Sequence, residues 1–195
     1  MAIFTTGDSH AMFGWPKYVQ TNYNTGMLCY TFGNTPRGII PEAVVNNIKE
    51  NDHLIFSYGE VDCRRHILKH VTDNISYKQV IDNITTQYFK KIHELTHKKQ
   101  YTIWVYNVVP PYSSQKAKVD LNWQRTADDE TTKSYYCYFN SSLKNMCKTY
   151  SYNFFDVYDK YADSDGFLKF ELSDKGVHIG NPIHIDEFCK LNNLV

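Results

Sequence analysis

The sequence predicts an α/β protein in which helices cover the faces of a mainly parallel sheet. Short apolar runs alternate along the chain with longer segments whose apolar residues recur at helical spacing. This alternation is typical of a parallel sheet with helices on its faces. The 195 residues suffice for one full hydrophobic core, and no internal repeat or low-complexity segment divides them. We therefore expect a single domain over residues 1–195.

Five apolar runs predict the strands of this sheet. In chain order they are residues 2–6, 18–23, 53–58, 101–109 and 153–158. The run 101–109 has the strongest strand pattern, and Pro110-Pro111 ends it because proline cannot donate a ladder hydrogen bond.

Four segments predict helices. Residues 41–50 begin with Pro41, which is favoured at the first helical position. Residues 76–98 begin with Ser76, a favoured capping residue, and place their apolar side chains on one stripe. Two further helices are expected over residues 129–149 and 185–194.

Composition indicates which binding partners and which cellular compartment to expect. The chain has 21 basic and 21 acidic residues, so its net charge gives no reason to expect binding to nucleic acid or to anionic membranes. It has no run of about 18 apolar residues and no basic-then-apolar leader, so we expect no membrane span and no signal peptide. Five scattered cysteines without a Cys-x-x-Cys pair are typical of reduced thiols. These features predict a cytoplasmic protein and leave its oligomeric state open, so that an oligomer is allowed.

Three polar segments stand out, two of them directly after predicted strands. Ligands of parallel sheets gather at the carboxyl ends of the strands. Ser9 comes directly after the first strand, residues 59–66 follow the third, and Asp174 and His178 share a segment near the end. A serine placed where a strand turns into a helix is exposed to substrate. An aspartate and a histidine in one loop can supply a base and the group that orients it.

Together these segments resemble the SGNH/GDSL hydrolase superfamily. The resemblance is carried by Gly-Asp-Ser-His after the first strand, Gly-x-x-Asp after the third and an Asp…His pair near the end, and it spans nearly the whole chain. It implies a three-layer α/β/α sandwich of the flavodoxin-like kind, with a five-stranded, mainly parallel sheet.

The resemblance also implies roles for individual residues. Ser9 would be the nucleophile, and its backbone N–H would contribute to the oxyanion hole. His178 would be the general base, oriented by Asp174, although these two are four residues apart where the family usually has three. Gly26 would supply a further oxyanion N–H, with Gly33 as the alternative.

One position departs from the family pattern. Val61 stands where the oxyanion-hole asparagine is expected, in the variant Gly-Glu-Val-Asp-Cys-Arg. Loss of one such donor typically costs about 2.7–4 kcal/mol of transition-state stabilisation. Arg64, Arg65 or His66 could replace it, or the oxyanion hole could consist of backbone N–H groups alone. The variant resembles family members associated with glycan assembly.

These observations predict acyl transfer through an acyl-Ser9 intermediate. We favour transfer of an acetyl group to a sugar or sugar nucleotide, with no bound cofactor. Acetyl-CoA is one candidate for the acyl donor, and the sequence leaves the donor open. Arg64, Arg65 and His66 would bind the substrate, because guanidinium groups suit phosphates. Two alternatives stay open: a hydrolytic carbohydrate O-acetylesterase, and a non-catalytic binding domain, which the loss of asparagine at Val61 would suit.

Other motifs have a structural interpretation. Residues 93–97 match the zinc-protease pattern His-Glu-x-x-His, but they end a helix without a third ligand downstream. We interpret them as an exposed helix end and expect no metal. Asp62 is interpreted as a cap of the helix that follows it.

Overall fold

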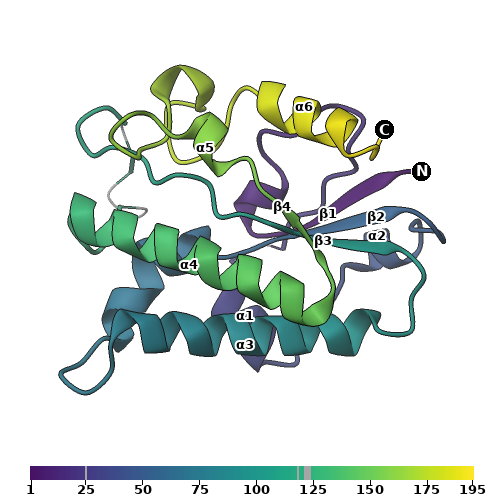
Figure 1. Ribbon diagram of the computed structural model, residues 1–195, viewed down its shortest axis with the longest axis horizontal. Helices are drawn as coiled ribbons and strands as arrows, with labels where there is room; N and C mark the ends of the chain where they lie inside the picture. The colour runs from purple at the N-terminus through teal and green to yellow at the C-terminus, as the bar shows by residue number, and fades with distance from the viewer. Residues whose placement is uncertain (25, 118, 121–123) are drawn as a thin grey trace.

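Four parallel strands form the centre of the molecule in the computed structural model, which describes residues 1–24, 26–117, 119–120 and 124–195 (Figure 1). They lie side by side in chain order and are β1 (Ile3–Gly7), β2 (His53–Ser57), β3 (Thr102–Tyr106) and β4 (Asn153–Phe155). Because all four run in the same direction, their carboxyl ends meet at one edge of the sheet.

The predicted strand over residues 18–23 is not a strand of this sheet, so the described sheet has four strands and not five. The segment follows β1 and touches it in isolated bridges at Gln20 and Tyr23. Between them the backbone N–H of Asn22 donates to the side-chain Oγ1 of Thr5 (3.2 Å). Since a hydroxyl takes the place of a backbone carbonyl, the ladder is interrupted there.

Helices cover both faces of the sheet, as the sequence predicts, and give three layers (Figure 1). One face carries α1 (Cys29–Asn34), α3 (Tyr77–Thr96) and α4 (Asp129–Tyr150), and the other carries α5 (Tyr158–Tyr161) and α6 (Ile183–Leu191). The shorter helical segments are α2 (Glu42–Val45), η1 (Ser9–Ala11), η2 (Asp62–His66), η3 (Ile67–His70) and η5 (Phe170–Leu172). None of the helices in the described ranges combines the length and apolar character that crossing a membrane requires.

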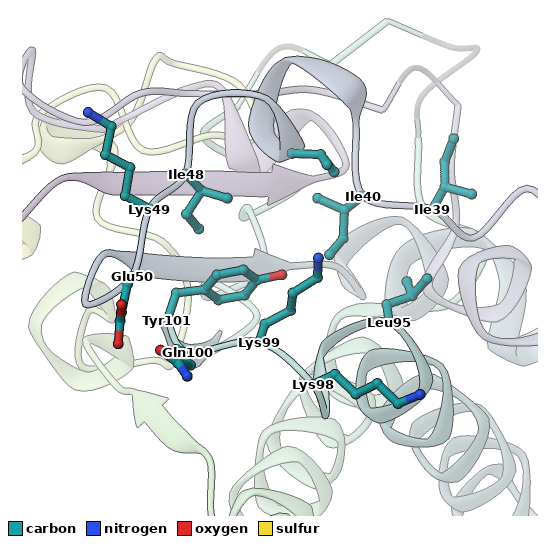
Figure 2. A pocket seen from close by; sticks show the side chains of 11 residues that line it. Ile39, Ile40, Ile48, Lys49, Glu50, Leu95, Lys98, Lys99, Gln100 and Tyr101 are labelled. Carbon is teal, nitrogen blue, oxygen red and sulfur yellow. The ribbon is translucent and has the colours of Figure 1, made fainter.

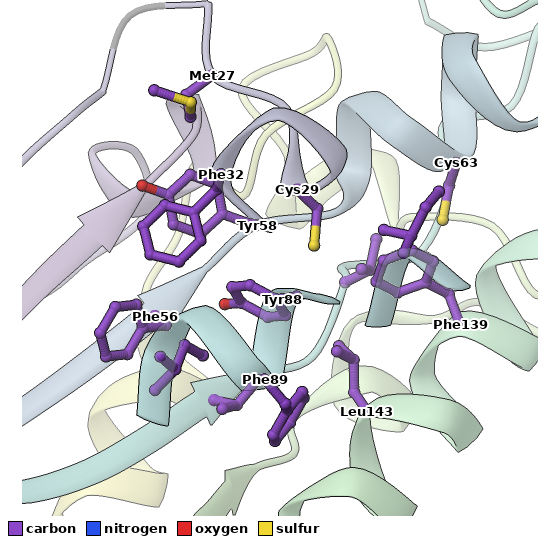
Figure 3. Packing of buried hydrophobic residues seen from close by; sticks show 14 of the residues in the cluster. Met27, Cys29, Phe32, Phe56, Tyr58, Cys63, Tyr88, Phe89, Phe139 and Leu143 are labelled. Carbon is purple, nitrogen blue, oxygen red and sulfur yellow. The ribbon is translucent and has the colours of Figure 1, made fainter. Parts of the chain in front are cut away.

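The strands alternate between two hydrophobic clusters, because successive strand side chains point to opposite faces. In β2, Phe56 faces the cluster beneath α1 and α3, whereas Ile55 faces the cluster beneath α6. Phe32 of α1 is fully buried in the first cluster, with its ring centroid 4.7 Å from Tyr58 and 5.7 Å from Tyr88 (Figure 3). These aromatic contacts hold α1 between the carboxyl end of β2 and α3.

The ends of the long helices follow local sequence signals. Ser76 caps α3 in a capping box, in which its Oγ accepts from the Gln79 N–H (3.3 Å) and the Gln79 side chain accepts from the Ser76 N–H (2.8 Å). The helix predicted over residues 41–50 is shorter and ends at Val45. Asp52 accepts a hydrogen bond from the Lys49 N–H (2.8 Å), which turns the chain toward β2 instead.

Candidate active site

The turn after β1 presents Ser9 at the carboxyl edge of the sheet. A Cβ atom on Gly7 would overlap the carbonyl oxygen of Ser57, so only glycine allows β1 and β2 to meet this closely. The Asp8 carboxylate then caps η1 by accepting from the His10 N–H (2.9 Å). Ser9 is the first residue of η1, so its backbone N–H has no acceptor within the turn.

A chain of hydrogen bonds, which we call the relay, connects Ser9 with the segment that contains Asp174 and His178. The Nε2 atom of His178 lies 2.9 Å from Ser9 Oγ, and its Nδ1 atom lies 2.8 Å from Asp174 Oδ2. The other carboxylate oxygen of Asp174 accepts from the N–H groups of Gly176 (2.8 Å) and His178 (3.2 Å). The four-residue spacing thus forms a closed turn in which the carboxylate meets the imidazole.

The protonation states of this relay suit a base and its orienting group. Burial lowers the pKa of His178, and the neighbouring His10 lowers it further. Burial alone would raise the pKa of Asp174, but hydrogen bonds from the His178 side chain and the Gly176 N–H bring it below its usual range. At neutral pH His178 is therefore uncharged and Asp174 is ionised.

The two glycines considered for the oxyanion hole lie in different places. Gly26 lines the same hollow as Ser9. Gly33 lies in α1, where a Cβ atom would come 2.8 Å from the backbone nitrogen of Tyr88 in α3. Its small size serves helix packing. Val61 also lines the hollow, where its side chain offers no donor.

The hollow beside Ser9 has a volume of about 690 Å³. Apolar side chains make up part of its wall, and cationic and imidazole groups make up another part. The first group is Tyr23, Met27, Leu28, Val61, Val119 and Val177, and the second is Arg64, Arg65, His66 and Lys69. The wall thus has room for an apolar acyl chain and a polar or anionic substrate group.

The predicted substrate-binding residues differ in their burial and in their hydrogen bonds to other protein groups. Arg64 is buried and donates twice to Glu60, through Nε (2.8 Å) and Nη2 (3.1 Å). Tyr136 donates to the same carboxylate (2.8 Å). Arg65 and His66 are partly exposed, and burial with the charges of neighbouring groups lowers the pKa of His66 to about 4. At neutral pH His66 can therefore act as an uncharged hydrogen-bonding group.

Asp62 caps a helix, but a different one from the helix that the sequence predicted. Its carboxylate accepts from the N–H groups of Cys29 (2.6 Å) and Tyr30 (3.0 Å), the first residues of α1, and makes no capping bond to η2. The contact joins segments far apart in the sequence, so local pattern gave no signal for it. It fixes α1 and, with it, the adjoining wall residues Met27 and Leu28.

The zinc-protease match and a second hollow lie away from Ser9. The Nδ1 atom of His97 lies 3.0 Å from the backbone oxygen of His93, at the end of α3. Within the described ranges, no group of three or more metal-binding side chains is placed to hold an ion. A hollow of about 390 Å³ lies among Ile40, Leu95 and Tyr101 (Figure 2). Since Tyr101 precedes β3, this hollow is at the opposite end of the strands from Ser9.

Comparison with known proteins identifies the fold. No family model matches the sequence, and no curated protein is significantly similar to it. Solved structures do match. A GDSL-like lipase from Bacteroides thetaiotaomicron superposes with a TM-score of 0.64 at 14% identity, over 98% of this chain and 86% of that one. The chain has the SGNH/GDSL hydrolase fold.

Two further solved structures are similar over almost the same length. The carbohydrate acetylesterase Est24 from Sinorhizobium meliloti matches with a TM-score of 0.53 at 14% identity, over 100% of this chain and 99% of that one. The OSK domain of Drosophila Oskar matches with a TM-score of 0.57 at 13% identity, over 98% and 86%. At these identities the likeness establishes the SGNH/GDSL fold, and the chemistry has to be argued from the site itself.

Proposed function

We propose that this protein is a serine esterase. It removes a small acyl group that is bound as an ester to a carbohydrate, and the reaction passes through an acyl-Ser9 intermediate. The observation that supports it most is the continuous relay from Asp174 through His178 to Ser9, with contacts of 2.8 and 2.9 Å. Nucleophile, base and orienting carboxylate are the constellation that serine acyl transfer needs. They lie beside a hollow large enough for a substrate.

In the proposed reaction each proton has a donor and an acceptor. Ser9 Oγ attacks the ester carbonyl carbon while His178 Nε2 takes its proton, and the Asp174 carboxylate stabilises the imidazolium. The N–H groups of Ser9 and Gly26 would receive the oxyanion. His178 then gives the proton to the departing alcohol oxygen, which leaves the acyl group on Ser9. Water attacks this ester with His178 as base, and the acid and the free serine are released.

Hydrolysis is favoured over transfer by the access of solvent to the relay. Ser9 and His178 are both partly exposed, so water can reach an acyl group on Ser9. The GDSL-like lipase and the carbohydrate acetylesterase of the same fold support this direction and the choice of a sugar ester. The hollow has both an apolar wall for the acyl group and polar groups for sugar hydroxyls.

Acetyl transfer to a sugar or sugar nucleotide, the direction that the sequence analysis favours, is the second candidate. The observation in its favour is the cationic part of the wall, where Arg65 and Lys69 line the hollow near Ser9. Such groups suit the phosphates of acetyl-CoA or of a nucleotide sugar.

A fluorophosphonate probe tests the serine mechanism, because it reacts with a serine that a neighbouring base activates. We expect the probe to label the wild type and the variant Ser134→Ala, whose serine is exposed on α4, and not Ser9→Ala. Cleavage of an aryl acetate should follow the same pattern. Absence of labelling and cleavage in the folded wild type would contradict the proposal and favour a non-catalytic binding domain.

Products formed with acetyl-CoA and a panel of sugars and nucleotide sugars decide the direction. Release of acetate from acetylated sugars without acetylated product supports hydrolysis. An acetylated sugar formed from acetyl-CoA, and lost in Ser9→Ala, would overturn hydrolysis in favour of transfer.

A further inference from the structure

A second Asp–His pair lies directly beside the relay. The Nδ1 atom of His10 is 3.2 Å from Asp8 Oδ1, and its Nε2 atom is 3.1 Å from the carbonyl oxygen of Val177. The side chain is only 5% exposed. Its ring centroid lies 4.7 Å from that of His178. His10, the residue after the proposed nucleophile, thus contacts the loop that holds the proposed base, and Asp8, the residue before the nucleophile, contacts His10.

Both partners of the His10 ring are hydrogen-bond acceptors. The carbonyl of Val177 can only accept, and Asp8 Oδ1 already accepts from the backbone N–H of His10 (2.9 Å). A neutral imidazole carries one N–H and could satisfy only one of these partners. An imidazolium donates from both nitrogens and satisfies both acceptors, so the geometry favours a protonated ring beside an ionised Asp8.

The surroundings of His10 favour this charge. Asp8 faces it from its own turn, and Glu60, which is paired with Arg64, faces it from the segment after β2. Burial alone would lower the pKa of His10, but the hydrogen bond to Asp8 and the charges of Glu60 and Asp8 raise it. On the remaining side lies the His178 ring, whose own partner is Asp174.

We propose that His10 is a positioning residue that, as a buried imidazolium, ties the loop of His178 to the turn of Ser9 and keeps His178 uncharged. The tie acts through the Val177 carbonyl, one residue before the base. The electrostatic effect follows because two adjacent imidazolium groups repel each other, so the charge on His10 opposes protonation of His178. The inference rests on the proposed function only where it treats His178 as the base.

Two magnetic resonance measurements test the charge without any substrate. In wild type with ¹⁵N-labelled histidine, both ring nitrogens of His10 should carry a proton at neutral pH. In His10→Gln, whose amide can still donate to Val177 but has no charge, the titration midpoint of His178 should rise by about one pH unit. The matched control is His97→Gln at the far end of α3, which should leave that midpoint unchanged.

Activity gives a further readout. In the pH profile of kcat/KM for an aryl acetate, the acidic limb should move to higher pH in His10→Gln, together with the titration midpoint of His178. At a pH on that limb, kcat/KM should fall about tenfold. A role limited to packing would lower activity at every pH without moving the limb.

Two results would overturn the inference: a single protonated nitrogen on His10 in the wild type, or an unchanged His178 midpoint in folded His10→Gln. The wild-type spectrum decides even if the variant fails to fold. If the protein proves not to be an esterase, the two resonance measurements still test the charge of His10 separately.

Discussion

At the scale of single residues, the relay depends on one tautomer of the His178 ring. Asp174 accepts from Nδ1, which leaves the lone pair of Nε2 directed at Ser9 Oγ. The carboxylate is held by two backbone N–H groups of its own turn, so it cannot swing away without losing them. The loop that carries His178 thus also orients this proposed base.

Asp174→Asn should therefore lower kcat on aryl acetates by roughly 10³- to 10⁴-fold, because an amide facing Nδ1 favours the wrong tautomer. Thermal unfolding should show that the variant keeps its fold. The neighbouring exposed residue supplies a control, Lys175→Gln, for which we expect wild-type kcat. An Asp174→Asn enzyme with unchanged kcat would show that the carboxylate does not orient the base.

The sequence predicted these residues unevenly. Ser9, Asp174 and His178 stand in recognisable short motifs, and the structure brings them together. The contact of His10 with Val177 spans 167 positions, and nothing local to either residue indicates it. The different locations of Gly26 and Gly33 were equally hidden, because only the fold shows that Gly33 packs against α3 and that Gly26 lines the hollow of Ser9.

At the scale of elements, α3 and α4 were predictable because their signals are local. Each begins at a capping residue, Ser76 or Asp128, and keeps one apolar stripe. The short α1 was not predicted, since its six residues include a glycine and its N–H groups are capped by Asp62 from beyond β2. A helix stabilised by a distant carboxylate and by packing leaves little trace in its own sequence.

The packing of α1 on α3 gives a prediction at this scale. Gly33→Ala should lower the free energy of unfolding by about 1–3 kcal/mol, because the added methyl group meets the α3 backbone at Gln87 and Tyr88. Asn34→Ala on the exposed side of the same helix should change it by less than about 0.5 kcal/mol. Denaturant unfolding measures both, and equal stabilities would contradict the packing described for α1.

At the scale of the whole molecule, Asp52 joins β1 and β2 at the edge of the sheet opposite the site. Its carboxylate accepts from the N–H groups of Ala2 (2.7 Å) and Lys49 (2.8 Å). Burial alone would raise its pKa, but these hydrogen bonds bring the pKa below the usual range. A carboxylate whose pKa is lower in the folded than in the unfolded state stabilises the fold at pH values above its unfolded-state pKa. This stabilisation is lost as the pH falls through its folded-state pKa.

Asp52→Asn should thus be less stable than wild type at neutral pH, and the difference should shrink as the pH falls below about 4. Thermal unfolding between neutral and acidic pH measures this. Asp73→Asn, at an exposed aspartate, is the control and should follow the wild-type curve. A difference between Asp52→Asn and wild type that stays constant with pH would contradict the assignment.

Helices on the faces of a parallel sheet were predictable from the alternation of apolar runs and helical stripes, and the resemblance to the SGNH/GDSL superfamily implied the three layers. The strand count was not predictable. Residues 18–23 have a strand-like pattern, but the hydroxyl of Thr5 takes a backbone hydrogen bond that a ladder needs. Such competition between a side chain and the backbone is decided only in three dimensions.

The contact between Ser9 and His178 also has a consequence for synthesis of the chain. Ribosomes make the amino-terminal part first, and the base follows the nucleophile by 169 positions. A nascent chain therefore carries Ser9 without His178 while the intervening residues are made. In the proposed function, a product that stops before residue 178 lacks the base, so reactivity toward esters would arise only when the loop of His178 packs against the turn of Ser9.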